Sequence, residues 1–303
     1  MTAQPPRTRR IRRRVDGVLL LDKPSGLSSN AALQRARRAF DAEKAGHTGT
    51  LDPLASGLLP LCFGEATKFA QFLLDSTKRY TATVRFGATT TTGDAEGEVL
   101  EMRPVALARA DVATVLPDFT GRLSQVPPAY SALKFEGRSH YEYARAGIDV
   151  PRPPREIEVL ALSLLEWNAP DAVLDITCSK GTYIRVLAED IGRALGCGAH
   201  LAQLRRTATG GFGIAEAVTL ERLEAMSPGE RDAAVRPAAA LLHDLPAVRL
   251  SPMDAGRFRQ GAAVLAPGST DGACAVFDGD ILLGVADVAA GLAQPRRVVA
   301  ATP

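Results

Sequence analysis

Short segments of alternating apolar and polar side chains predict several β-strands. Residues 80–86 and 173–178 alternate in this way, which is typical of strands with one buried face. Residues 18–21 are continuously apolar and precede the turn-forming sequence Asp-Lys-Pro-Ser-Gly, so they also predict a strand. Residues 89–97 are rich in threonine and glycine and predict a loop.

Two further segments carry apolar residues at helical spacing. The first begins at the N-cap candidates Ser28, Ser29 and Asn30 and runs to Phe40. The second covers residues 184–195 and precedes a glycine, which is common just after a helix end. Because helices and strands are intermixed without regular βαβ spacing, we predict an α+β fold whose larger domain has a mixed, mostly antiparallel sheet.

Composition shifts along the chain predict its domain organisation. A larger domain is expected over residues 15–243, with a proline-bounded insertion at residues 126–155. Farther on, apolar segments flank Asp-Gly-Asp at residues 278–280, a strong hairpin signal, and a last strand is expected at residues 297–300. Residues 244–303 therefore predict a small β-rich domain.

The composition is that of a folded protein outside membranes. The 303 residues are 46% hydrophobic and 23% charged, which supports a large core and excludes a disordered chain. No run approaches the roughly 18 uncharged apolar residues of a membrane helix. No apolar segment of a secretory signal follows the N-terminal arginines. We therefore expect no membrane association.

Positive charge is concentrated at the N-terminus. Residues 1–14 hold six arginines and no acidic residue, whereas the whole chain has a net charge of only +2. A disordered basic arm of this kind is typical of proteins that bind a polyanion such as nucleic acid. It is also typical of a terminus that only raises solubility, so charge alone leaves both interpretations open.

The sequence indicates neither a metal nor a nucleotide cofactor. The four cysteines and four histidines are dispersed, without the spacing of a zinc site or a disulfide framework. The chain has no GxxxxGK[ST] motif and no GxGxxG motif after a predicted strand. We expect a reduced, cytoplasmic protein without a cofactor.

Asp52 is the first candidate for chemistry. The sequence Leu51-Asp52-Pro53 is typical of a helix start, with aspartate as the N-cap and proline at the first helical position. The local sequence favours this structural interpretation. It does not exclude catalysis, because a carboxylate at a helix N-terminus is stabilised in its charged form, as a nucleophile requires.

Aromatic and basic side chains are mixed in the insertion. Three of the five tyrosines, Tyr130, Tyr141 and Tyr143, lie there among five lysines and arginines. Such a mixture suits single-stranded or looped RNA, in which exposed bases stack on rings and phosphates need cations. A satellite hydrophobic cluster with solvated charges explains the same pattern, so both interpretations stay open.

Three more candidates have ordinary interpretations when they are taken singly. Arg185 stands at a strand-to-helix junction, where it could pair with a carboxylate or a phosphate or face solvent. His47 is most simply a turn residue, and Leu204 is most simply part of the core.

Six motifs occur in order and together resemble one family. They are GVLLLDKP (residues 17–24), AGHTGTLDPLASG (45–57), GEATK (64–68), KRY (78–80), YSALK (130–134) and CSKGTYIR (178–185). This set resembles the TruB family of tRNA pseudouridine synthases over residues 17–206. That family converts uridine 55 in the T loop of tRNA to pseudouridine. The C-terminal domain resembles a PUA domain.

The resemblance implies three catalytic residues. Asp52 matches the catalytic aspartate of the family, and Arg185 matches the arginine that pairs with it. Tyr80 matches the tyrosine that stacks on the uracil after the base has flipped out of the RNA.

The resemblance also implies residues that bind the substrate. His47 matches a histidine that contacts the RNA where the flipped base was, and Tyr183 and Leu204 match residues lining the uracil pocket. Lys23 matches a lysine near the site. The insertion would grip the RNA, and the PUA-like domain would hold the acceptor-stem side of the tRNA.

The implied function is that of a cytoplasmic isomerase acting on the T stem-loop of tRNA. We expect a monomer that needs no cofactor and no protein partner. Two other interpretations stay open, a synthase guided to another RNA and an RNA-binding or tRNA-folding chaperone. The insertion and the short C-terminal domain favour the stand-alone enzyme, and the set of Asp52, Tyr80 and Arg185 argues against a chaperone alone.

Overall fold

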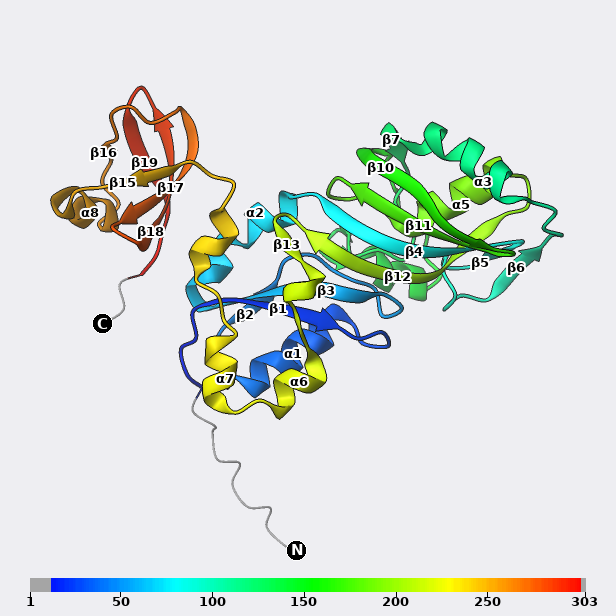
Figure 1. The fold of residues 1–303 in the computed structure, drawn as a ribbon, viewed down its shortest axis with the longest axis horizontal. Helices are drawn as coiled ribbons and strands as arrows, with labels where there is room; N and C mark the ends of the chain where they lie inside the picture. Colours follow the sequence, from blue (N-terminus) through cyan, green and yellow to red (C-terminus); the bar gives the residue numbers. More distant parts are fainter. Residues whose placement is uncertain (1–11, 301–303) are drawn as a thin grey trace, which may run out of the picture.

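The computed structural model describes residues 12–300, which form two domains on either side of a linker near residue 245 (Figure 1). The larger domain is built on one sheet. Its strands are β1 (Gly17–Lys23), β2 (Ala45–His47), β3 (Ser56–Phe63), β4 (Lys78–Phe86), β7 (Gly121–Gln125), β10 (Arg155–Asn168), β11 (Asp171–Cys178), β12 (Ala199–Thr209), β13 (Phe212–Gly213) and β14 (Val218–Thr219).

The pairing of these strands confirms the α+β prediction. Within residues 12–300 the sheet order is β14-β1-β3-β12-β4-β11-β10-β7, with β2 beside β3 and β13 beside β12. In this sheet the β1–β14 and β3–β12 pairs are parallel, and the remaining pairs are antiparallel. The sheet is therefore mixed and mostly antiparallel, as the sequence predicts.

Helices and short hairpins complete the larger domain. The helices are α1 (Ser29–Ala39), α2 (Ala70–Asp75), α3 (Arg109–Val115), α4 (His140–Arg145), α5 (Ile184–Ala194), α6 (Leu220–Ala225) and α7 (Pro228–Ala233), with 3₁₀ turns η1 (Gly64–Phe69), η2 (Leu116–Phe119), η3 (Ile214–Glu216) and η4 (Ala238–Leu242). The hairpins are β5 (Ala88–Thr90) with β6 (Val99–Met102), and β8 (Lys134–Phe135) with β9 (Arg138–Ser139). The loop predicted at residues 89–97 is thus partly strand.

The strand β1 is buried on both faces. Leu19 and Leu21 pack into the core that contains α1 and α5, whereas Val18 and Leu20 pack on the opposite face against η1, α2 and η4. A strand covered on both faces has no solvent-facing positions. This explains the continuous apolar run that predicted it.

The helices α1 and α5 begin and end as predicted. The Ser28 side chain caps α1 by accepting a hydrogen bond from the Ala31 backbone N–H at 3.1 Å. The helix α5 ends at its C-cap Leu195, and Gly196 follows with φ of +79°. Both helix boundaries are therefore encoded locally.

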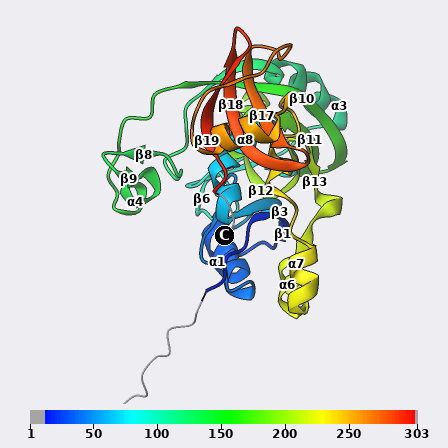
Figure 2. The ribbon, with the colours of Figure 1, turned by 90° about the vertical axis from the view of Figure 1, so that its left-hand side faces the viewer.

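The insertion leaves the sheet between β7 and β10. Figure 2 shows β8, β9 and α4 projecting from the body of the larger domain. Two ring pairs stabilise this small unit: Tyr130 packs edge-on against Tyr141 at 5.8 Å, and Phe135 against Tyr143 at 6.0 Å. The guanidinium of Arg145 lies over the Tyr141 ring at 4.4 Å.

The C-terminal domain is a five-stranded sheet with one helix in the described chain. Its elements are β15 (Ala247–Arg249), α8 (Pro252–Arg259), β16 (Val264–Leu265), β17 (Gly272–Asp278), β18 (Ile281–Ala289) and β19 (Leu292–Val298), in the sheet order β15-β17-β18-β19-β16. The predicted hairpin is confirmed by the β17–β18 pairing. The last strand begins at Leu292, five residues earlier than predicted, because it pairs along β18.

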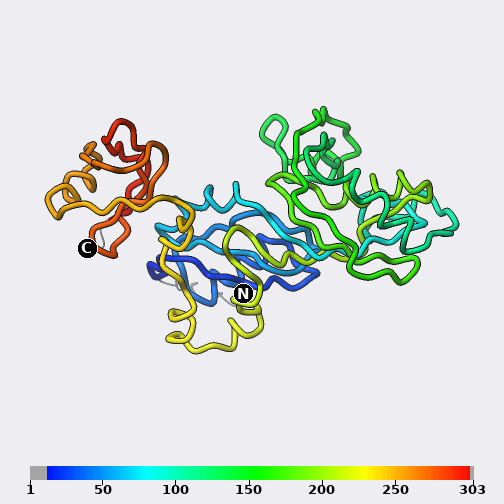
Figure 3. The backbone as a smooth tube through the Cα atoms, turned by 45° about the horizontal axis from the view of Figure 1, so that its top comes forward, coloured from blue at the N-terminus to red at the C-terminus, as the bar shows by residue number. Residues whose placement is uncertain are grey.

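The two domains share a hydrophobic cluster. Ala275 and Val285 of the C-terminal sheet pack with Leu58 and Phe69 of the larger domain. Figures 1 and 3 show the C-terminal domain at one end of the large sheet, opposite the end formed by β7, β10 and α3.

The last residues of the predicted arm are part of the folded domain. Arg13 forms an isolated bridge with Ala42 and donates from Nη1 to Asp232 at 2.9 Å. The ordered chain therefore begins before the boundary predicted at residue 15. Arg7, Arg9 and Arg10 of the predicted arm lie outside the described residues.

Candidate active site

Asp52 lies in the loop between β2 and β3. The helix start predicted there is wrong: the Ala55 backbone N–H donates to the Asp52 carbonyl at 3.1 Å in a single turn, and β3 begins at Ser56. The physical reason is the tertiary environment of the residues that follow. Residues 56–63 pair with β1 and are buried between two cores, so they form a strand although Asp-Pro is a common helix start.

The Asp52 loop is held by main-chain and side-chain hydrogen bonds. Ser29 Oγ donates to the Leu51 carbonyl at 2.9 Å and accepts from the Leu51 N–H at 2.7 Å. On the other side of Asp52, the Pro53 carbonyl accepts from the Gly26 N–H at 2.8 Å. Asp52 is therefore presented from a loop whose backbone is fixed on both sides.

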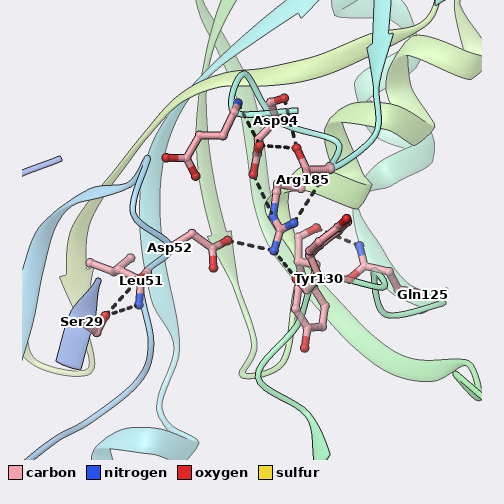
Figure 4. Close-up of polar contacts among 10 residues, drawn as sticks. Ser29, Leu51, Asp52, Asp94, Gln125, Tyr130 and Arg185 are labelled. Carbon is pink, nitrogen blue, oxygen red and sulfur yellow. Dashed lines mark hydrogen bonds and ion pairs between the residues drawn. The ribbon is translucent and has the colours of Figure 1, made fainter. Parts of the chain in front are cut away.

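Arg185 is the charge partner of Asp52. It lies in the first turn of α5, and its Nη2 is 2.9 Å from Asp52 Oδ2 (Figure 4). The Arg185 side chain is only 6% exposed, so the solvent-facing interpretation is wrong. The Asp52 side chain is 42% exposed, so the carboxylate is paired on one side and open on the other.

The remaining donors of Arg185 are also occupied. Nη1 donates to the Thr92 carbonyl at 3.0 Å, and Nη2 donates to the Tyr130 carbonyl at 2.8 Å. Nε lies 3.6 Å from Oδ2 of Asp94, whose side chain is 5% exposed. The guanidinium plane is therefore fixed from several directions, which suits bidentate and multidentate arginine contacts.

Asp94 is a site residue that the sequence analysis missed. Its Oδ1 accepts hydrogen bonds from Thr92 Oγ1 at 2.5 Å and from the Glu96 N–H at 3.1 Å. It lies in the stretch interpreted only as a threonine- and glycine-rich loop. Nothing local distinguishes Asp94 from Glu96 or Glu98, since its proximity to Arg185 depends on the packing of α5.

A cavity of about 250 Å³ lies next to Asp52. It is lined by Asp52, Tyr80, Tyr183, Leu204 and Arg185, which brings together five of the seven predicted residues. Burial raises the pKa of the Tyr80 hydroxyl, although the nearby Arg206 charge opposes the shift. Burial also raises the pKa of Tyr183, so both phenols are neutral at physiological pH.

Lys78 and Arg206 also line this cavity. Arg206 is 1% exposed and donates from Nε to the Leu58 carbonyl at 2.7 Å and from Nη2 to the Gly49 carbonyl at 3.2 Å. Neither residue was predicted to belong to the site. Lys78 is the first residue of the KRY motif, and Arg206 lies two positions after Leu204 on β12.

A second cavity, of about 790 Å³, is also lined by Asp52. Its lining includes His47, Asp52, Glu96, Tyr130 and Tyr141, so the insertion supplies part of its wall. Burial lowers the pKa of His47, and the Arg206 charge lowers it further, so this imidazole is neutral at pH 7. His47 Nδ1 is buried without a hydrogen-bond partner within the described chain.

Lys23 is close to the site but lines neither cavity. It is fully buried, and its Nζ donates to the carbonyls of Pro24 at 2.9 Å and Leu27 at 2.6 Å. Burial lowers the pKa of Lys23 to about 8, against the opposing charge of Asp52. The structure thus places Lys23 beneath the site rather than on its surface.

In the part of the chain that the structure describes, no group of three or more His, Cys, Asp or Glu side chains is arranged to hold a metal ion. No helix among residues 12–300 is long and apolar enough to cross a membrane.

Comparison with known proteins identifies the family. The chain is 56% identical over 304 residues to tRNA pseudouridine synthase B of Burkholderia lata, which covers 98% of this chain and 94% of that protein. The family model described as TruB family pseudouridylate synthase (N terminal domain) matches residues 37–184. The chain belongs to the TruB family of pseudouridine synthases. It is therefore an isomerase.

Further comparisons extend the match over both domains. The chain is 53% identical over 290 residues to tRNA pseudouridine synthase B of Thiobacillus denitrificans, covering 95% of this chain and 97% of that one. Models described as tRNA pseudouridylate synthase B C-terminal domain and as Pseudouridine synthase II TruB, C-terminal, match residues 185–254 and 246–299.

Solved structures confirm the fold of this TruB-family chain. A Cbf5-Nop10-Gar1 complex contains a chain with a TM-score of 0.70 and 28% identity, covering 90% of this chain and 78% of that one. An archaeal box H/ACA sRNP Nop10-Cbf5 complex contains one with a TM-score of 0.72 and 25% identity, covering 93% and 85%.

Proposed function

We propose that this TruB-family protein converts uridine 55 in the T loop of tRNA to pseudouridine, with Asp52 as the catalytic carboxylate. The observation that carries the proposal is the position of Asp52. It is paired with Arg185 on one side, is open on the other, and lies on the wall shared by two cavities. The full-length relatives named tRNA pseudouridine synthase B support tRNA as the substrate.

The reaction requires little beyond a positioned carboxylate. The N1–C1′ bond breaks, the uracil turns, the C5–C1′ bond forms, and the proton on C5 is lost while N1 gains one. No electrons are exchanged with a co-reactant. Asp52 can serve by adding to C6, by attacking C1′ or by removing the 2′ proton, and each route needs the open face that the structure gives this side chain.

The smaller cavity is the site that we assign to the flipped uracil. A uridine inside a folded T loop cannot present C1′ and both base faces to Asp52, so the base must leave the stack. Tyr80 would stack on the uracil and assist removal of the C5 proton, while Tyr183 and Leu204 would form the walls.

The larger cavity is the site that we assign to the RNA around the flipped nucleotide. His47 is half-buried and lines this cavity, and its Nδ1 has no hydrogen-bond partner within residues 12–300. It would contact RNA in the space left by the base. Tyr130 and Tyr141 bring the insertion to the same cavity. The insertion would therefore close on the RNA, and the PUA-like domain would hold the acceptor-stem side.

A tritium-release assay tests this function. Unmodified tRNA transcript labelled at uridine C5 is incubated with purified protein and no additives, and the modified position is mapped. We expect release confined to uridine 55. Release at other uridines, or no release at all, would contradict the proposal.

The Asp52→Ala variant tests the catalyst. Because Asp52 supplies the reacting group, we expect this variant to release no tritium. We expect its tRNA affinity to stay within about tenfold of the wild type, roughly 1.4 kcal/mol. Pseudouridine formed by Asp52→Ala would show that another group is the catalyst.

The same assay separates the alternatives. Two structural neighbours are described in complexes with partner proteins, and one of these complexes is an archaeal box H/ACA sRNP. A guided synthase is therefore the alternative to test. We propose instead a cytoplasmic monomer that acts without a guide. Activity on bare tRNA would support it, whereas tight binding without activity would favour a guided enzyme or a tRNA-folding chaperone.

A further inference from the structure

Two buried side chains bond the backbone next to Asp52 and Arg185. The first is Ser29, in the first turn of α1, which is 2% exposed. Its hydroxyl bonds both main-chain polar groups of Leu51, the carbonyl at 2.9 Å and the N–H at 2.7 Å. Leu51 directly precedes Asp52.

The second is Gln125, the last residue of β7, which is 5% exposed. Its Oε1 accepts from the Tyr183 N–H at 2.8 Å, and its Nε2 donates to the Tyr183 carbonyl at 3.1 Å (Figure 4). Tyr183 is the N-cap residue of α5 and provides no side-chain cap of its own. Arg185 follows two residues later.

The two side chains form the same pattern of hydrogen bonds. Each side chain bonds both main-chain groups of one residue. Leu51 lies outside any strand or helix, and Tyr183 is the N-cap of α5, whose carbonyl also accepts from the Leu187 N–H at 3.1 Å. Ser29 reaches 22 positions along the chain and Gln125 reaches 58, so each fixes a loop to an ordered element. Loops are otherwise the mobile parts of a domain.

We infer that Ser29 and Gln125 are positioning residues that hold Asp52 and Arg185 in their ion pair before RNA binds. The inference rests on the proposed function, because it concerns the rate of that reaction. Catalytic groups must be held within about half an ångström of productive geometry. Side chains that act only through the backbone should therefore affect the chemical step far more than the binding of tRNA.

Single-turnover kinetics on tRNA test the inference. With enzyme in excess, we expect Ser29→Ala and Gln125→Met each to lower the rate constant for pseudouridine formation at least tenfold. We expect the Kd for tRNA to stay within about twofold. Ser29→Thr keeps the hydroxyl and should retain the wild-type rate. A rise in Kd with an unchanged saturating rate would overturn the inference, because it would make these side chains RNA contacts.

Matched controls separate positioning from general stability. Ser227→Ala removes the N-cap of α7, and Ile157→Val removes a buried methylene on β10, the strand paired with β7. Both should lower the melting temperature and leave the rate unchanged. A rate loss in these controls equal to that in the two test variants would overturn the inference. If Gln125→Met does not fold, Ser29→Ala, which removes a single oxygen, decides alone.

The double variant tests whether the two side chains act on one ion pair. Because both act through the Asp52–Arg185 contact, the double variant should lose less rate than the product of the single losses. A loss in the double variant equal to the product of the two single losses would show that the two side chains do not act on the same ion pair. Wild type and Asp52→Ala are measured in parallel: inactive wild type refutes the proposed function, whereas active wild type with unimpaired test variants refutes only this inference.

Discussion

At the scale of single residues, the burial of Arg185 explains why each of its hydrogen-bond donors faces a polar partner. Arg185 is held between the carboxylates of Asp52 and Asp94, and its other donors meet backbone carbonyls. Buried charges need such partners, since an unpaired guanidinium would carry a large desolvation cost. The motif around Arg185 could be recognised in the sequence, but its second carboxylate could not, because Asp94 lies 91 positions away in a loop.

Lys23 gives a pH dependence of stability with a definite sign. Its pKa is lowered by burial to about 8 in the folded chain, against about 10.4 in an unfolded one. Between these values the unfolded chain holds a proton that the folded chain has released. Unfolding then takes up a proton, so the free energy of unfolding rises with pH in this window.

The prediction is tested against Lys23→Met in denaturant melts from pH 7 to pH 10. We expect the stability of the wild type, measured relative to the variant, to increase above about pH 8. The two carbonyl acceptors of Lys23 match the two N–H groups of a neutral amine, so they remain satisfied there. A difference that stays constant with pH would show that Lys23 keeps an ordinary pKa.

At the scale of elements, the insertion is tied to the helix that carries Arg185. Gln125 precedes the insertion and bonds Tyr183, and the Tyr130 carbonyl within it accepts from Arg185. The cations farther out face solvent: Lys134, Arg138 and Arg145 are exposed. The part of the insertion nearest the larger domain is therefore fixed to the site, whereas its outer part carries exposed positive charges.

These cations should contribute to the salt dependence of tRNA binding. Each phosphate contact adds about 0.7 to 0.9 to the slope of log Kd against log salt. We expect replacement of Lys134, Arg138 and Arg145 by glutamine to reduce that slope by about 2. An unchanged slope would show that the outer part of the insertion does not contact phosphates.

The N-terminal arginines can be tested by the same measurement of salt dependence. Arg13 is bonded to Asp232 and Phe40 within the larger domain, so a truncation should stop before it. Deleting residues 1–11 removes three arginines and should also flatten the slope by up to about 2. Equal slopes for the truncated and full chains would support the interpretation of a terminus that only raises solubility.

At the scale of the whole molecule, one cluster joins the two domains. Val285 and Ala275 pack with Phe69 and Leu58, and Lys68 Nζ donates to the Val298 carbonyl at 2.9 Å. Buried apolar area shared between domains couples their stabilities. The C-terminal domain is therefore docked against the larger domain.

This docking predicts a single unfolding transition. The only tryptophan, Trp167, lies on β10 against Phe86, so its fluorescence reports on the larger domain, whereas circular dichroism reports on both. We expect the two signals to coincide in denaturant. Val285→Asp places a carboxylate in the shared cluster and should separate them. Separate transitions in the wild type would show that the domains unfold independently.

The sequence by itself determined the local elements and the residues of the motifs. Its periodicity and caps placed β1, β4, β11, α1 and α5, because these signals act within a few residues. Motif order also pointed to Asp52, Tyr80 and Arg185. The tertiary structure decided that Asp52 lies in a loop, that Arg185 is buried and that Lys23 lies beneath the site. It also revealed the contacts of Gln125 with Tyr183, since contacts across 58 positions arise only from packing.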